Sequence, residues 1–251
     1  MGRNISIGGF LVLLLMSAPA DAQIVNVLSF ADSAAAGWGG GLTGGLDWRT
    51  GNQDLTAVRV NGAIGWRGES DHVFLLVRGE YGVRDEEVYL SRAFEHLRYR
   101  RRFLEVWAVE AYLQHETDVF RRMQIRALAG LGLRRSIGDW EAARFVIGSA
   151  WMPEYNLVED ESAGSVVQRW SNYATLELDL EQSVTASATV FAQPRFDDLG
   201  DVRVSLTAGI QARVGRFLVV PISLSLTHDS RPPAGVDALD TTVQSSVGFE
   251  L

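Results

Sequence analysis

The chain has 251 residues, of which 47% are hydrophobic and 22% are charged, and its formal net charge is −8 at pH 7. This composition is too polar for a bundle of membrane helices and too apolar for a disordered chain, and the acidic balance argues against a nucleic-acid partner. The absence of cysteine excludes disulfides, thiolate metal sites, cysteine nucleophiles and a lipidated N-terminal cysteine.

Residues 1–22 have the layout of a secretory signal peptide. Arg3 precedes an apolar run from Ile5 to Met16, and Ala20-Asp21-Ala22 offers a cleavage site. The apolar run is shorter than the about 20 residues that a membrane-spanning helix needs. The sequence therefore predicts a cleaved leader and an exported protein.

After the leader, apolar and polar residues alternate with a period of two, which is typical of β-strands. From Val202 to Val214 every even position is apolar, and the odd positions hold polar residues or glycine. The same alternation runs from Leu218 to Leu226 and from Ile125 to Leu133. These runs exceed the strands of about 5–6 residues that are common in soluble proteins, and they match tilted membrane-spanning strands.

Twelve segments of this kind are predicted, near residues 38–50, 55–67, 72–83, 94–100, 103–115, 120–134, 139–152, 170–181, 183–194, 201–214, 217–228 and 241–251. The connections at 68–71, 101–102, 135–138, 182 and 215–216 are short, whereas those at 84–93, 153–169 and 229–240 are long. Short periplasmic turns and longer outer loops would give this asymmetry, and an even number of strands is usual in bacterial barrels. The predicted fold class is all-β, a closed antiparallel transmembrane β-barrel of about 12 strands.

The tryptophans fall near the predicted strand ends, with Trp38, Trp66 and Trp140 at the periplasmic side and Trp48, Trp151 and Trp170 at the outer side. Amphipathic rings prefer the boundary between lipid and water, so two aromatic girdles are expected.

If the apolar face meets lipid, the alternate face lines the interior. The charged and polar candidates on that face are Arg78, Glu80, His96, Arg98, Glu110, Gln114, Arg126, Glu177, Asp179, Arg203 and Arg213. They could line a solute- or ion-selective pore, or they could pair with one another and plug a narrow interior. Twelve strands lie between filled barrels of about 8 strands and open channels of about 16, so the strand number leaves both interpretations open.

Catalytic motifs are nearly absent, since the chain has no nucleophile elbow, no zinc-protease helix motif and no phosphate-binding loop. His115 and His228 lie on the predicted lipid-facing side near outer strand ends, and Asp229 and Ser230 follow His228. A Ser–His pair there could hydrolyse membrane lipid, but imidazoles in an interfacial belt are the simpler interpretation. We expect no enzymatic activity, no cofactor and no metal site.

Several short segments occur in a recognisable order: Gln23–Val27, Gly51–Asp54, Phe94–Tyr99, Trp107 with Glu110–Gln114, Arg126–Arg134 and His228–Pro233. Together they resemble an uncharacterised family of salt-induced outer-membrane β-barrel proteins of Gram-negative bacteria, a domain of unknown function. The resemblance implies an outer-membrane barrel and no assigned chemistry. It also implies a tyrosine where this chain has His228, which weakens the lipid-hydrolysing alternative.

The predicted organisation is a signal peptide (1–22), a periplasmic lead-in or short plug (23–37) and an outer-membrane barrel (38–251). Expected partners are outer-membrane lipid, lipopolysaccharide through Arg49, Arg121 and Arg169, and the barrel-assembly machinery, whose signal the apolar alternation of the last strand resembles. The oligomeric state is left open.

The predicted function is a passive channel for small solutes or ions, or an envelope protein linked to osmotic conditions. The alternatives are a closed structural barrel that binds through its outer loops and, after it, a lipid-hydrolysing barrel enzyme.

Overall fold

The structure, a computed structural model, describes residues 36–51, 54–140, 142–159, 161–181, 183–214, 218–245 and 248–249. The predicted signal peptide, and the predicted lead-in up to residue 35, lie outside these residues. Within the described ranges, no helix is long and apolar enough to cross a membrane.

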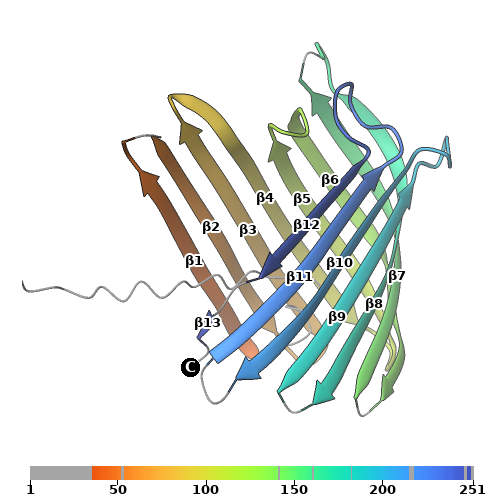
Figure 1. The fold of residues 1–251 in the computed structure, drawn as a ribbon. Helices are drawn as coiled ribbons and strands as arrows, with labels where there is room; N and C mark the ends of the chain where they lie inside the picture. Colours follow the sequence, from red (N-terminus) through yellow and green to blue (C-terminus); the bar gives the residue numbers. More distant parts are fainter. Residues whose placement is uncertain are drawn as a thin grey trace, which may run out of the picture.

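The described residues form one antiparallel sheet of thirteen strands, in which β1 to β12 pair in chain order and β13 pairs with β11. The strands are β1 (Gly37–Arg49), β2 (Leu55–Arg67), β3 (Asp71–Arg84), β4 (Glu87–Arg102), β5 (Trp107–Asp118), β6 (Met123–Trp140), β7 (Ala143–Val158), β8 (Ser165–Glu181), β9 (Val184–Pro194), β10 (Val202–Val214), β11 (Leu218–Asp229), β12 (Leu239–Ser245) and β13 (Gly248–Phe249). Figure 1 shows the sheet curling round, so that β11 and β12 pass in front of earlier strands.

The short strand β13 continues β12 along the edge of β11. Ser245 lies opposite Ile222, and Gly248 lies opposite Val219, so the register is unchanged across the two pieces. The sheet therefore has twelve strand positions, as the alternation predicts, and the all-β antiparallel barrel class is confirmed. Among the described residues no pairing joins β1 to β12, so the closure of the barrel stays a prediction.

Several predicted strand ends are wrong, because charged or turn-forming residues suggested loops where the structure has strands or tight turns. The expected long loop at 84–93 is a two-residue turn at Asp85 and Glu86, whose φ angles are 48° and 69°. Positive φ at both central residues is the geometry of a tight hairpin, so β4 begins at Glu87. The expected turn at 135–138 lies inside β6, which continues past an irregularity in register between Ser136 and Gly138.

Strands β7 and β8 are longer than predicted, and the expected loop at 153–169 shrinks to residues 159–164. Pro153 suggested a strand end because proline cannot donate to a sheet, yet it lies within β7 opposite Gln168. Trp151 and Trp170 consequently lie within their strands rather than at the ends. Strand β5 is also shifted, because residues 103–106 belong to the preceding turn.

Contacts between strands that are not neighbours identify the concave side of the sheet. The Tyr173 hydroxyl on β8 donates to Glu110 on β5, and Arg203 on β10 donates to Glu154 on β7. We call the side that carries these residues the inner face and the opposite side the outer face. Residues with even numbers in β3 to β7, and residues with odd numbers in β2 and in β8 to β11, lie on the inner face.

The outer face is apolar around the whole sheet. Each of the twelve strand positions exposes at least one large apolar side chain: Leu46, Val60, Leu75, Leu97, Leu113, Leu131, Ile147, Val166, Val190, Ile210, Ile222 and Val243. A soluble protein rarely exposes such a continuous apolar surface.

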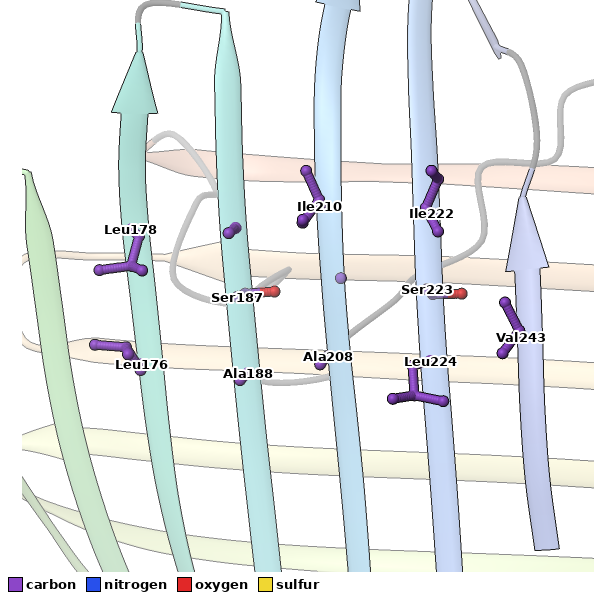
Figure 2. A pocket seen from close by; sticks show the side chains of 12 residues that line it. Leu176, Leu178, Ser187, Ala188, Ala208, Ile210, Ile222, Ser223, Leu224 and Val243 are labelled. Carbon is purple, nitrogen blue, oxygen red and sulfur yellow. The ribbon is translucent and has the colours of Figure 1, made fainter.

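On the outer face of β8 to β12, small residues leave a shallow groove of about 310 Å³. Figure 2 shows Ala188 and Ala208 between the larger side chains of Leu176 and Leu178 on β8 and those of Ile222 and Leu224 on β11. The groove follows from the run of alanines on β9 and β10.

On the inner face, two tyrosine rings lie over glycines of the neighbouring strand. A Cβ atom on Gly130 would lie 2.0 Å from the Tyr112 ring, and one on Gly148 would lie 2.1 Å from the Tyr173 ring. Glycine is thus required at both positions for the rings to lie flat on the strand.

Replacing Gly130 with alanine is expected to force the Tyr112 ring out of the buried cluster that it forms with Leu128, Ala150 and Met152. We expect a loss of about 1–3 kcal/mol, the usual cost of overpacking. The measurement is urea unfolding of the refolded protein in detergent, followed by tryptophan fluorescence. The control is Gly79→Ala, because a Cβ at Gly79 meets nothing within 4 Å. Equal stability of the two variants would contradict the packing of the Tyr112 ring on Gly130.

Candidate functional site

The candidate site is the charged inner face, which is organised around two buried carboxylates. The first is Glu110 on β5, only 3% exposed. The Arg100 Nε donates to its Oε1 at 2.9 Å, the Arg98 Nη1 lies 3.5 Å from its Oε2, and the Tyr173 hydroxyl donates to Oε2 at 2.7 Å. Arg134 on β6 lies 3.9 Å away. We call these five residues the Glu110 cluster, and it joins β4, β5, β6 and β8.

Aromatic rings and a histidine surround the guanidinium group of Arg98. Its centre lies 4.7 Å from the Tyr112 ring and 5.9 Å from the Tyr173 ring, both distances typical of cation–π contacts. Its Nε donates to the His96 Nε2 at 3.2 Å, and the His96 Nδ1 lies 3.1 Å from the Gln114 Oε1. Arg98 is therefore oriented from several sides at once.

The second buried carboxylate is Glu154 on β7, which is 1% exposed. Arg126 on β6 donates to its Oε2 from Nη2 at 2.8 Å and from Nε at 3.1 Å. Its Oε1 accepts from Arg203 and from the Asn156 amide and lies 3.5 Å from the Arg169 Nε. We call Arg126, Glu154, Asn156, Arg169 and Arg203 the Glu154 cluster, which ties together β6, β7, β8 and β10.

The Glu154 cluster continues toward the strand ends that carry the connection 195–201. The Arg203 Nε donates to Asp229 at 2.7 Å, and the Arg169 Nη2 donates to Asp201 at 2.9 Å. In the connection itself, two hydrogen bonds from Arg195 lower the pKa of Asp197 below its usual value. The charged network thus reaches one mouth of the barrel.

The inner face of β9 to β12 differs from this charged wall. Besides Phe191, Gln193, Arg203, Arg213 and Asp229, it carries mainly small hydroxyl side chains. Several of its polar residues are accessible to water: Thr185, Ser205, Thr207, Gln211, Ser225, Thr227 and Thr242. The long charged side chains are thus more frequent on β4 to β8, and small hydroxyl side chains on β9 to β12.

The sequence-based site residues fall into two groups. His96, Arg98, Glu110 and Gln114 come together in and around the Glu110 cluster, and Arg126 and Arg203 join the Glu154 cluster, as described above. The others have different contacts. Arg78 lies over the Phe94 ring, Glu80 lies 3.8 Å from Arg59, and Glu177 accepts from Arg144 at 3.1 Å. Asp179 and Arg213 are exposed and lie near the strand ends that are away from the connection 195–201.

Sequence reasoning missed Glu154, Arg169, Arg134 and Tyr173. The first two fell in the expected loop at 153–169, although continuing the even alternation Ala150, Met152, Glu154 along β7 would have found Glu154. Tyr173 was passed over because a tyrosine carries no formal charge.

The two histidines considered for catalysis lie on the outer face. His115 Nδ1 is 2.7 Å from Glu95 on the adjacent strand, and the two side chains are 47% and 44% exposed. Ser230 is engaged in loop structure, since its hydroxyl donates to the Gly200 carbonyl and accepts from the Val202 amide. Among the described residues no group of three or more His, Asp or Glu side chains is arranged to hold a metal ion.

A family model described as "Protein of unknown function, DUF481" matches residues 43–251. No curated protein matches the chain. Among solved structures, the NanC porin is 12% identical over 85% of this chain and 98% of its own, with a TM-score of 0.51. The translocator domain of the autotransporter NalP from Neisseria meningitidis is 10% identical over 90% of this chain and 92% of its own, with a TM-score of 0.46. At these identities, the likeness to the porin shows the fold alone.

Replacing Glu110 with glutamine would remove the negative charge that Arg98, Arg100 and Arg134 approach. We expect a loss of about 3–5 kcal/mol, because breaking a buried ion pair leaves buried charge behind. The measurement is urea unfolding in detergent. Glu159→Gln is the matched control: Glu159 lies in the connection after β7, its side chain is 55% exposed, and its pair with Arg122 should contribute at most about 1 kcal/mol. Equal effects of the two substitutions would mean that the Glu110 cluster does not stabilise the barrel.

Proposed function

The chain belongs to the DUF481 family of proteins of unknown function, and from its interior we propose that it acts in the outer membrane as a passive channel for small solutes or ions. The observation that carries this proposal is the set of water-accessible small polar side chains on the inner face of β9 to β12. Polar walls with fixed charges are how barrel interiors admit water and select solutes.

An outer-membrane location is supported by the outer face. Its apolar side chains are continuous over all twelve strand positions, and a surface of this kind needs lipid or protein to cover it. We further propose export by the leader at residues 1–22 and insertion by the barrel-assembly machinery, with lipid as the main partner of the outer face. Contact of Arg49 and Arg121 with lipopolysaccharide belongs to the same proposal. Arg169, predicted from the sequence to share this role, is only 3% exposed and lies in the Glu154 cluster, so it is not part of it.

A second candidate function is a closed barrel that acts through its outer loops. It is favoured by the two clusters, since Tyr173 and Arg203 each reach across intervening strands to a buried carboxylate. An interior bridged in this way is partly filled, so the passage in the channel proposal is narrow and runs beside β10 and β11. We do not propose a lipid-hydrolysing enzyme, because Ser230 is held in loop hydrogen bonds.

The channel proposal is tested by single-channel recording of the refolded protein in a planar lipid bilayer with a salt gradient. Discrete current steps are expected. Gln211, which lies on the inner face and is exposed, is the position to vary. Gln211→Glu and Gln211→Arg should shift cation-over-anion permeability in opposite directions by about two-fold, since a unit charge about 8 Å from an ion in water changes its energy by about 0.5 kcal/mol.

Gln211→Asn is the matched control, because it changes the side chain without adding charge and should leave selectivity unaltered. Discrete steps whose selectivity does not respond to charge at Gln211 would place the conducting path elsewhere. Folded, inserted protein that never conducts would favour the closed barrel.

A further inference from the structure

The connection between β11 and β12, residues 230–238, makes contacts far from its own strands. We call it the strap. The Arg122 Nη1 donates to the Ala234 carbonyl at 2.7 Å. Just beyond the strap, at the start of β12, the Asp240 Oδ2 lies 3.7 Å from the Arg121 Nε. Arg121 and Arg122 belong to the turn between β5 and β6.

These two connections are not neighbours around the barrel. The β5–β6 turn and the strap are six strand positions apart in a sheet of twelve positions. A closed barrel of twelve strands spaced about 4.8 Å apart and tilted by about 40° would be roughly 24 Å across. A contact between the two connections therefore requires the strap to reach over the mouth of the barrel, and Figure 1 shows this connection among the loops at the upper end of the sheet.

The near end of the strap is fixed to the connection at 195–201. The Arg231 Nη2 lies 2.5 Å from Asp198, and the Ser230 hydroxyl donates to the Gly200 carbonyl at 3.1 Å. The strap is thus anchored on one side and reaches the β5–β6 turn on the other.

Beneath the strap lies the outer part of the charged network. A small pocket of about 40 Å³ is lined by Pro232, Pro233 and Val236 of the strap on one side and by Asn156 and Arg203 of the Glu154 cluster, with Asp229, on the other. Since a site for one water molecule takes about 10–15 Å³, this pocket has room for only a few waters. The strap therefore lies close to the charged network at this place.

The hydrogen bond from Arg122 to the far part of the strap is exposed, and next to it the pair of Asp240 (58% exposed) with Arg121 joins the start of β12 to the same turn. Surface contacts of this kind contribute about 1 kcal/mol or less each. The backbone of the strap combines the stiff pair Pro232-Pro233 with Gly235 at a φ of 80°, a conformation that glycine adopts without strain. A stiff segment with a glycine bend and weak far-end contacts can lift from the mouth as a unit.

We propose that the strap is a gate, which closes the outer mouth when the β5–β6 turn holds it and opens when the contact between Arg122 and Ala234 separates. The inference rests on the proposed channel function, because a gate has a meaning only where something passes. It names the segment that controls passage through the proposed channel.

The geometry is tested first, without reference to conduction. Because the chain has no cysteine, the double variant Arg122→Cys with Ala234→Cys introduces two unique thiols in the full-length protein. A short bismaleimide with a cleavable disulfide in its spacer should join them in membranes. In the control pair, Glu87→Cys with Ala234→Cys, the first thiol lies at the start of β4, away from the strap, and little cross-linking is expected. Equal cross-linking of both pairs would overturn the contact across the mouth.

The gate is then tested by single-channel recording. Cross-linking the Arg122/Ala234 pair should reduce the open fraction about tenfold or more, and reductive cleavage of the spacer should restore it. A variant in which residues 231–237 are replaced by a Gly-Ser linker should be open about tenfold more of the time than the parent.

The outcomes separate the two proposals. Complete cross-linking with unchanged conductance would overturn the gate and leave the channel standing. A folded and inserted strap-free variant that never conducts would overturn the channel, and the gate with it. Silence of the parent together with conduction by the strap-free variant would support both.

Discussion

Two buried carboxylates, Glu110 and Glu154, connect strands of this barrel that backbone hydrogen bonds do not join. A charge removed from water costs several kcal/mol unless partners with good geometry surround it. Arginines of the adjacent strands surround each carboxylate. A more distant strand adds Tyr173 at Glu110 and Arg203 at Glu154. Since every member needs the others to offset its desolvation, strands β4 to β10 are held in one arrangement.

Arginine suits this role better than lysine would. All 23 basic residues of the chain are arginines. The planar guanidinium group donates through several N–H groups in fixed directions, so one side chain can serve two carboxylates and also stack on a ring. Arg203 bonds both Glu154 and Asp229, and Arg98 lies over Tyr112 while it approaches Glu110. The same property lets the network continue from the middle of the barrel to its mouth, where the strap rests on it.

Much of the fold could be predicted from the sequence because the period of alternation directly reflects which face is apolar. The twelve strand positions follow from that period, as do the inner-face placements of Arg98, Glu110, Arg126 and Arg203. The ends of the strands were harder to predict. The charges of Asp85 and Glu86 hid a two-residue turn, and Pro153 hid the continuation of β7, because residue preferences near a strand end are overridden by pairing with the adjacent strand. Contacts across the interior could not be predicted at all. The approach of Tyr173 to Glu110 depends on the curvature of the sheet and the length of the side chains, neither of which the alternation encodes.

The central claim is that the apolar face of the sheet meets lipid while the polar face lines a water-containing interior. It is tested most directly by spin-label scanning of β10, one cysteine at a time from Val204 to Gln211, in reconstituted membranes. Collision with oxygen, which dissolves in lipid, and with a water-soluble nickel complex should alternate with a period of two. Val204, Leu206, Ala208 and Ile210 should be accessible to oxygen, and Ser205, Thr207 and Gln211 to nickel. Uniform access of nickel to both faces, or the opposite phase, would contradict the account.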